Sequence, residues 1–132
     1  MLFRHLDSFG SGCLRSAESG RELEIMRYRT VFNSVSGGNV VFLVANTATD
    51  QMHKFVIFNT DLPEDQLPRT AEGNVDEEGA GVTHVDEVAD MAVGQVSDLA
   101  VKLEPGRYVL VCNLSENSQH YLAGMYIVFT VN

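Results

Sequence analysis

Short segments in which apolar and polar side chains alternate recur along this chain from about residue 21 onward, and they constrain its fold more than any other feature. Period-two alternation with many β-branched and aromatic residues is typical of half-buried strands, whereas an amphipathic helix repeats about every 3.6 residues. Six segments show the strand pattern clearly: Glu22–Arg29, Asn39–Asn46, His53–Asn59, Gln95–Leu103, Arg107–Asn113 and Met125–Val131. Weaker strands are expected at Val31–Val35 and Val82–Val88.

Turn-forming residues separate these segments, at Ser36–Gly38, Thr47–Asp50 and Glu104–Gly106. Six to eight short strands without a convincing amphipathic helix predict an all-β fold, an antiparallel Greek-key β-sandwich. A chain of 132 residues is long enough to bury about two-thirds of its unfolded surface in one domain. We therefore expect a single domain over residues 21–132, preceded by a flexible tail over residues 1–20 that contains glycine and serine.

The segment Asp61–Asp90 has a weaker pattern, is interrupted by prolines and glycines, and holds ten of the eighteen acidic residues. It is interpreted as a long surface excursion, with a short helical turn near Pro63–Leu67 and a hairpin around Gly79–Val85. The simplest explanation of its charge is a solvated face. The alternative is a docking surface for a cationic partner.

The overall charge and the motifs exclude several classes of function. Eighteen acidic and nine basic residues give a net charge of -9, which argues against binding to nucleic acid or anionic lipid because both need positive charge. No apolar run approaches the roughly 20 residues of a transmembrane segment, and residues 1–20 lack the continuous apolar core of a secretory signal. No nucleophile-base set, phosphate loop or pair of catalytic carboxylates stands out, so we expect no enzyme activity.

One cysteine, one histidine and one methionine, Cys112, His120 and Met125, fall within fourteen residues near the C-terminal end. Alternation places Cys112 at the end of one inward row and Met125 at the start of the next, with His120 on the loop between them. His53 opens another inward row on a distant strand. Two imidazoles and a thiolate with a weak thioether suit an ion that cycles between Cu(II) and Cu(I). The sequence therefore predicts one copper ion bound by these four residues.

A disulfide and a zinc site both compete with copper as the role of these side chains. Cys13 and Cys112 are the two cysteines of the chain and would form one disulfide in an exported domain, although Cys13 lies in the tail, outside any patterned segment. Zinc also binds cysteine and histidine, but methionine is a poor zinc ligand, so the softness of the set favours copper. The remaining histidines, His5 in the tail and His84 in the excursion, are expected to be surface residues.

The ligand segments resemble a known family. Pro105–Leu114 followed by His120–Met125 looks like the copper-binding end of the cupredoxins, the plastocyanin and azurin family. Upstream, Asn46 followed by His53–Ile57 and Thr60–Pro63 resembles the first-histidine strand of bacterial members close to sulfocyanin. The similarity covers nearly the whole patterned part of the chain.

The resemblance implies a type 1 blue copper protein with a defined ligand set. Its three equatorial ligands and one axial ligand would be, in that order, His53, Cys112, His120 and Met125. The resemblance also implies that Asn46 and Asn113 help to fix the loops around the metal.

A site with four protein ligands has no open position for a substrate, so the expected function is one-electron transfer between a protein redox donor and an acceptor. The family leads us to expect a monomer in the periplasm or another extracytoplasmic compartment. His120 would be the electron exit, with a ring edge at the surface inside an apolar rim of Leu114, Tyr121, Leu122 and Ala123, for which loop packing is an equal explanation. A copper delivery protein, or a non-catalytic accessory module of a larger oxidase, is the alternative function.

The ligand loop departs from the bacterial relatives. Seven residues, among them Ser115–Gln119, separate Cys112 from His120. This spacing is closer to the long ligand loop of copper nitrite reductases than to that of the small electron carriers. The longer loop keeps the ligands and leaves the site geometry, colour and reduction potential open.

Overall fold

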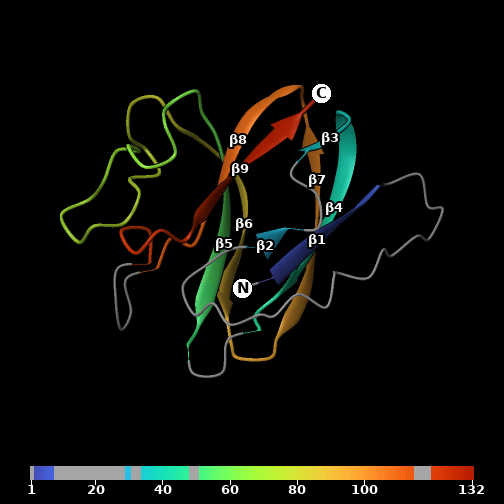
Figure 1. Ribbon diagram of the computed structural model, residues 1–132, viewed down its shortest axis with the longest axis horizontal. Helices are drawn as coiled ribbons and strands as arrows, with labels where there is room; N and C mark the ends of the chain where they lie inside the picture. The colour runs from blue at the N-terminus through green and yellow to red at the C-terminus, as the bar shows by residue number, and fades with distance from the viewer. Residues whose placement is uncertain (1, 8–28, 31–33, 48–50, 115–119) are drawn as a thin grey trace.

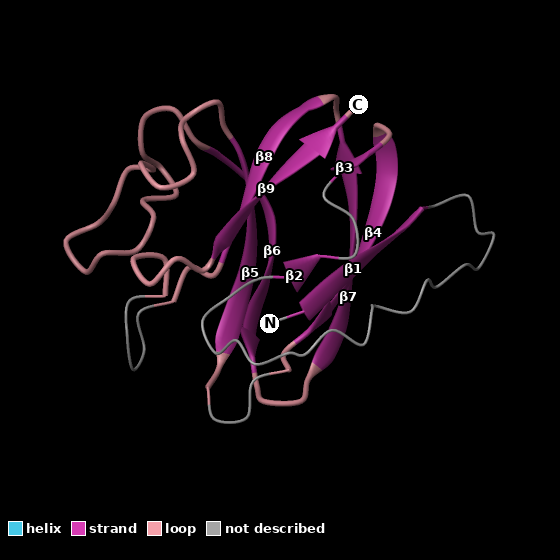
Figure 2. Cartoon of the chain, viewed as in Figure 1, coloured by secondary structure: helices cyan, strands magenta, loops and turns pink. Residues whose placement is uncertain are grey.

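The computed structural model describes residues 2–7, 29–30, 34–47, 51–114 and 120–132. Among these residues there are nine strands and no helix (Figure 2). The strands are β1 Leu2–Asp7, β2 Arg29–Thr30, β3 Ser34–Val35, β4 Gly38–Ala45, β5 His53–Asn59, β6 Thr83–Met91, β7 Val96–Leu103, β8 Gly106–Val111 and β9 Tyr126–Val131. Since the described residues contain no helix, none of them forms a helix that would cross a membrane.

The strands form two sheets, one in the order β2-β1-β4-β7 and the other in the order β3-β9-β8-β5-β6 (Figure 1). The long strands pair antiparallel, and only the two-residue strands β2 and β3 pair parallel to their neighbours. Pairing of β4 with β7 and of β5 with β8 joins strands that are not consecutive in the chain. These crossovers confirm the predicted all-β Greek-key sandwich.

The main core lies between the two sheets and follows the alternation of the sequence. Phe42 of β4 is fully buried, and its ring centroid lies 5.4 Å from that of Phe55 and 5.4 Å from that of Phe129 in the opposite sheet. Tyr108 and Leu110 of β8 point into this core. The inward faces that alternation predicted are therefore confirmed, and burial of these aromatic rings supplies a large part of the driving force for folding.

The outer face of the second sheet is also covered. Leu67 and Val75 pack against Val109 and Val111 of β8. They belong to the loop between β5 and β6, residues 60–82, which we call the covering loop. This loop lies beside the sandwich, at the left of the view in Figure 1. Because β8 is buried on both faces, the loop is part of the fold and not only a solvated excursion.

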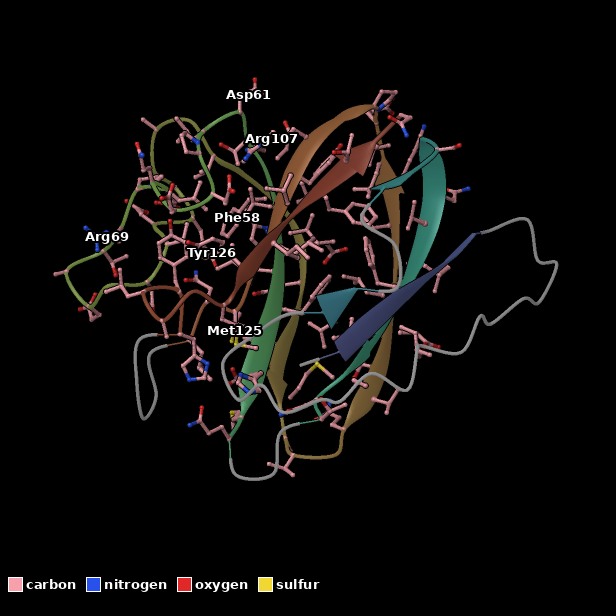
Figure 3. All side chains as sticks on the ribbon, viewed as in Figure 1. Phe58, Asp61, Arg69, Arg107, Met125 and Tyr126 are labelled. Carbon is pink, nitrogen blue, oxygen red and sulfur yellow. The ribbon has the colours of Figure 1, made fainter. Side chains whose placement is uncertain are left out.

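Arg107 fastens the start of this loop to β8 (Figure 3). Its guanidinium donates hydrogen bonds to the carbonyls of Thr60 and Leu62 at 3.1 and 2.6 Å, and to the Glu64 carboxylate at 2.8 Å. A turn follows, in which Gln66 N–H donates to Pro63 C=O at 2.9 Å. The turn expected at this position is confirmed, although it forms no helix.

The weak strand expected at Val82–Val88 is confirmed as β6, whereas the surface excursion expected to reach Asp90 and the hairpin expected around Gly79–Val85 are wrong. Residues 83–91 form β6, which pairs with β5 over its length, and no hairpin forms at Gly79–Val85. Acidic side chains at exposed and half-exposed positions weaken the alternation of this strand. An edge strand of this kind tolerates charge because one side of its backbone faces no other strand.

The N-terminal tail also differs from expectation. Leu2–Asp7 forms β1 and pairs with β4 from Ala45 to Val40, so this part of the predicted tail belongs to the first sheet. The rest of the tail with Cys13 lies outside the described residues, as do all but Arg29 of Glu22–Arg29 and the first part of Val31–Val35. Leu2–Asp7 carries no clear strand signal, because two apolar residues are followed by two polar ones and period-two alternation is absent.

Candidate metal centre

Three of the four predicted ligands meet at the end of the sandwich. The Nδ1 atoms of His53 and His120 lie 3.2 Å apart, and Cys112 Sγ lies 3.6 Å from His53 Nδ1 and 3.2 Å from His120 Nδ1. All three side chains are fully buried, and the ring planes of the two histidines are inclined at 66°. Two ring nitrogens and one thiol sulfur therefore converge on a single point.

Strand ends and backbone hydrogen bonds place these groups. His53 is the first residue of β5, and Cys112 directly follows β8. Cys112 N–H donates to the carbonyl of Met125 at 3.0 Å, and Met125 N–H donates to the carbonyl of His120 at 3.1 Å. A further bond from His120 N–H to Leu114 C=O, at 3.0 Å, closes the base of the loop. The positions of the ligands thus follow from the pairing of β5, β8 and β9.

Met125 is fully buried in the main core together with Cys112. It immediately precedes β9 and is labelled in Figure 3. Its backbone bonds to both Cys112 and His120 hold its side chain at the same end of the sandwich. The fourth predicted ligand is therefore tied to two of the other three.

The thiol and the first imidazole are both uncharged without a metal. Burial raises the pKa of Cys112 to about 12, even though the N–H of Lys54 donates a hydrogen bond to its sulfur at 3.2 Å. Burial, with a smaller contribution from the neighbouring His120, lowers the pKa of His53 to about 4. A neutral imidazole has a free lone pair for a cation, and a cation would favour the thiolate over the thiol.

The spacing of the three atoms fits a small metal ion. Ligand bonds of about 2.0–2.3 Å at 120° to one another would separate their atoms by about 3.5–3.7 Å, close to the 3.2–3.6 Å observed. Two imidazoles and a thiolate with a thioether nearby are a donor set for copper, whereas zinc prefers a fourth hard or thiolate ligand. The donor set fits one copper ion.

Solved structures with the same arrangement of strands are known. Reduced auracyanin from Roseiflexus castenholzii superimposes with a TM-score of 0.56 at 19% identity, covering 77% of this chain and 86% of that one. The chain has the cupredoxin fold. Rusticyanin from Thiobacillus ferrooxidans shares the cupredoxin fold with a TM-score of 0.56 at 21% identity, over 75% of this chain and 59% of that one.

A structure of reduced rusticyanin gives the same TM-score of 0.56, and the match covers 61% of its chain. This chain therefore spans about three-fifths of the length of rusticyanin. No protein-family model matches the sequence, and no curated protein sequence matches it. The cupredoxin fold is consequently established by structure rather than by sequence similarity.

The two asparagines that were expected near the site are both buried. Asn46 donates from its side chain to the carbonyls of Gln51 and Met91, each at 2.9 Å, which joins the segment before β5 to the end of β6. Asn113 bonds the backbone of Val75, accepting from its N–H at 2.8 Å and donating to its carbonyl at 3.1 Å. Both therefore fix loops that flank His53 and Cys112.

The expected exit at His120 needs correction, because its ring is fully buried in the cupredoxin fold. Tyr121 is buried as well, with its hydroxyl accepting from Leu67 N–H and donating to Glu64 C=O, both at 2.9 Å. Of the predicted apolar rim, Leu122 and Ala123 are exposed. The exit was expected because a loop histidine can bring a ring edge to the surface, but here the loop packs inward. Loop packing, the other explanation given for the rim, therefore holds for Tyr121.

His84 was wrongly expected to be a plain surface residue. It lies on β6 and is half-buried, with its ring 6.1 Å from that of Phe58 at 80°. The side chain of His5 is outside what the structure describes. Lys54 was missed as a partner of Cys112, and its place directly after His53 on a strand was the available signal.

Proposed function

We propose that this chain is a mononuclear type 1 copper protein that carries one electron at a time between redox partners. The observation that carries the proposal is the convergence of His53 Nδ1, His120 Nδ1 and Cys112 Sγ within 3.6 Å. His53, Cys112 and His120 would bind the ion as equatorial ligands, with Met125 as the weak axial ligand. Bound copper would supply a one-electron couple between Cu(II) and Cu(I).

The closed character of the site favours electron transfer over catalysis. The four side chains have no exposed surface, so they leave no open side on which a substrate would reach the ion. Metal sites that activate water or substrate keep such a position open. The chain is accordingly proposed to act without chemistry on a substrate.

The hydrogen bonds around Cys112 should keep the geometry of the site nearly the same in the two oxidation states. Its sulfur accepts a hydrogen bond from Lys54 N–H at 3.2 Å, and its own N–H is bound to Met125 C=O at 3.0 Å. Ligands held by strands and by hydrogen bonds of the protein itself are hard to displace. A site that barely rearranges transfers electrons with a low barrier.

Protein redox donors and acceptors are the proposed partners. Leu122 is 46% exposed and follows the buried pair of His120 and Tyr121, so it offers an apolar contact near the site. Small apolar contacts with a polar rim are typical of the short-lived complexes that redox proteins form. The cupredoxin fold supports an extracytoplasmic location and a monomer, which are proposed on that ground.

Titration of the purified protein with copper, with the cysteine thiols kept reduced, tests this function. We expect one equivalent to bind, an intense thiolate-to-Cu(II) charge-transfer band in the visible spectrum, and a reversible one-electron wave in voltammetry. Colourless Cu(I) that a chelator removes easily would indicate copper delivery instead. A protein that binds no copper would indicate an accessory module and would refute the proposal.

A further inference from the structure

A second group of metal-binding side chains lies on the outer face of the second sheet. Glu77, His84 and Glu87 each offer one ligand atom, and these atoms lie within 4.8 Å of one another. All three residues are half-buried. None of them belongs to the site of His53 and Cys112.

A bulge in β6 brings His84 and Glu87 to one face. His84 lies opposite Phe58 and Glu87 lies opposite Val56, with a register shift between Ile57 and Phe58. Residues three apart on a regular strand would point to opposite faces. One extra residue in the bulge places both on the side of Phe58 and Val56, which faces the covering loop, and bulges commonly re-aim side chains at sites.

The imidazole of His84 offers one ring nitrogen to this group. Its Nε2 is buried and has no hydrogen-bond partner within the described part of the chain. The ring is held edge to face against Phe58, with the centroids 6.1 Å apart. A buried imidazole nitrogen is costly to leave without a partner, and a metal ion would provide one.

Glu77 is held in place by Asn113, the residue that follows the proposed copper ligand Cys112. Asn113 donates from Nδ2 to Glu77 Oε1 at 3.1 Å and to Val75 C=O at 3.1 Å. These bonds hold this part of the covering loop against Asn113, which lies just after β8. The carboxylate is therefore positioned before any ion binds.

Lys54 only partly neutralises the two acids. Its ammonium lies 2.8 Å from Glu87 Oε2 and 3.8 Å from Glu77 Oε1. One positive charge faces two carboxylates, which leaves a net negative charge beside the imidazole. Lys54 has a long flexible stem, so it can swing toward solvent when a divalent ion takes its place.

We propose that Glu77, His84 and Glu87 form a second site, for a divalent cation of the zinc type. Zinc binds to sets of three protein ligands such as one imidazole and two carboxylates, and water then occupies the remaining coordination position. Small side-chain rotations would close the present spacing to the about 3.4 Å that bonds of about 2.0–2.2 Å give in a tetrahedron. The site does not depend on copper binding at Cys112.

Calorimetric titration of the whole, metal-free protein with Zn²⁺ tests the proposal. The quantity compared is the number of zinc ions bound by the wild type and by each variant. We expect His84→Phe to bind one equivalent fewer than the wild type, and Cys112→Ser to keep that equivalent. Phenylalanine keeps an aromatic ring beside Phe58 and lacks the ring nitrogens that would bind the ion. Because the difference counts the second site alone, it succeeds or fails separately from the copper centre.

Three further variants sharpen the assignment. Glu87→Gln should weaken zinc binding at the second site about tenfold or more. Glu104→Gln should leave this binding unchanged, because Glu104 is an exposed acid outside the group, with its carboxylate 3.9 Å from the ammonium of Lys102. Lys54→Met should strengthen it, because the internal competing cation is gone. Equal zinc stoichiometry in wild type and in folded His84→Phe, checked by circular dichroism, would overturn the proposal.

Discussion

The backbone N–H of Lys54 donates a hydrogen bond to the Sγ of Cys112 at 3.2 Å, across 58 positions of sequence. This bond joins the start of β5 to the end of β8 at the point where His53 and His120 meet. A hydrogen bond to sulfur stabilises the thiolate relative to the thiol, and it limits movement of the ligand. Since the donor is the backbone, the bond survives any non-proline substitution of the Lys54 side chain.

Cys112→Ser should abolish the visible charge-transfer band of the copper-loaded protein. A serine oxygen is a harder and weaker donor than a thiolate, so the band has no origin in the variant. Absorption spectroscopy after titration with copper measures the effect. Cys13→Ser is the matched control and should keep the full band; loss of the band in that variant would move the ligand assignment to Cys13.

Met125→Leu should retain copper and raise the reduction potential. The thioether donates electron density that favours Cu(II), and leucine fills the same buried volume without it. A tenfold relative loss for Cu(II) corresponds to about 59 mV in a one-electron couple. Voltammetry measures the change, and Met91→Leu, equally buried in the same core, should leave the potential in place. Equal potentials in wild type and Met125→Leu would remove Met125 from the ligand set.

Asn113→Ala should lower the free energy of unfolding of the metal-free protein by about 3 kcal/mol, because two buried backbone groups lose their partners. Those groups are the N–H and the carbonyl of Val75, bound at 2.8 and 3.1 Å. Urea denaturation measures the loss. Asn39→Ala, at an exposed position of β4, should change stability by less than about 0.5 kcal/mol. Similar losses in both variants would show that Asn113 does not hold the covering loop.

Tyr121→Phe should destabilise the protein by about 1–3 kcal/mol through loss of one hydroxyl. That hydroxyl bonds the backbone of Leu67 and of Glu64, each at 2.9 Å. Tyr126 is the matched control, because its ring packs on Tyr121 at 5.3 Å while its hydroxyl has no hydrogen-bond partner among the described residues. Tyr126→Phe should be nearly neutral in thermal melting, and an equal cost in the two variants would contradict this account of the loop.

The metal-free protein should lose stability as the pH falls from about 6.5 to about 4. In this window the unfolded chain binds a proton at His53, whereas the folded chain keeps the ring neutral because burial lowers its pKa to about 4. The unfolded state therefore binds more protons, and stability rises with pH, by on the order of 3 kcal/mol in total for this residue. Denaturation at pH 7.0 and 4.5 measures the slope, which should be smaller in His53→Gln. An unchanged slope in His53→Gln would show that other groups cause the loss of stability at low pH.

The alternation pattern was enough to predict the class of fold, and the residue types near the C-terminal end were enough to propose the ligands. Period-two alternation over segments such as His53–Asn59 and Arg107–Asn113 requires strands with one apolar face, and such faces become stable only when two sheets cover one another. Cys112, His120 and Met125 lie close in sequence, so their proximity in space needed little more than the pairing of β8 with β9. Local spacing and side-chain chemistry were sufficient for both predictions.

Tertiary structure decided what depends on contacts between distant segments. The burial of Tyr121 and His120, the role of Leu67 and Val75 as a second core, and the joining of Glu77 to His84 all result from the covering loop folding back on β5 and β8. A loop without hydrophobic periodicity carries no signal of the face on which it packs. The bulge in β6 likewise changes the side on which Glu87 lies, and only the observed register of the pairing reveals it.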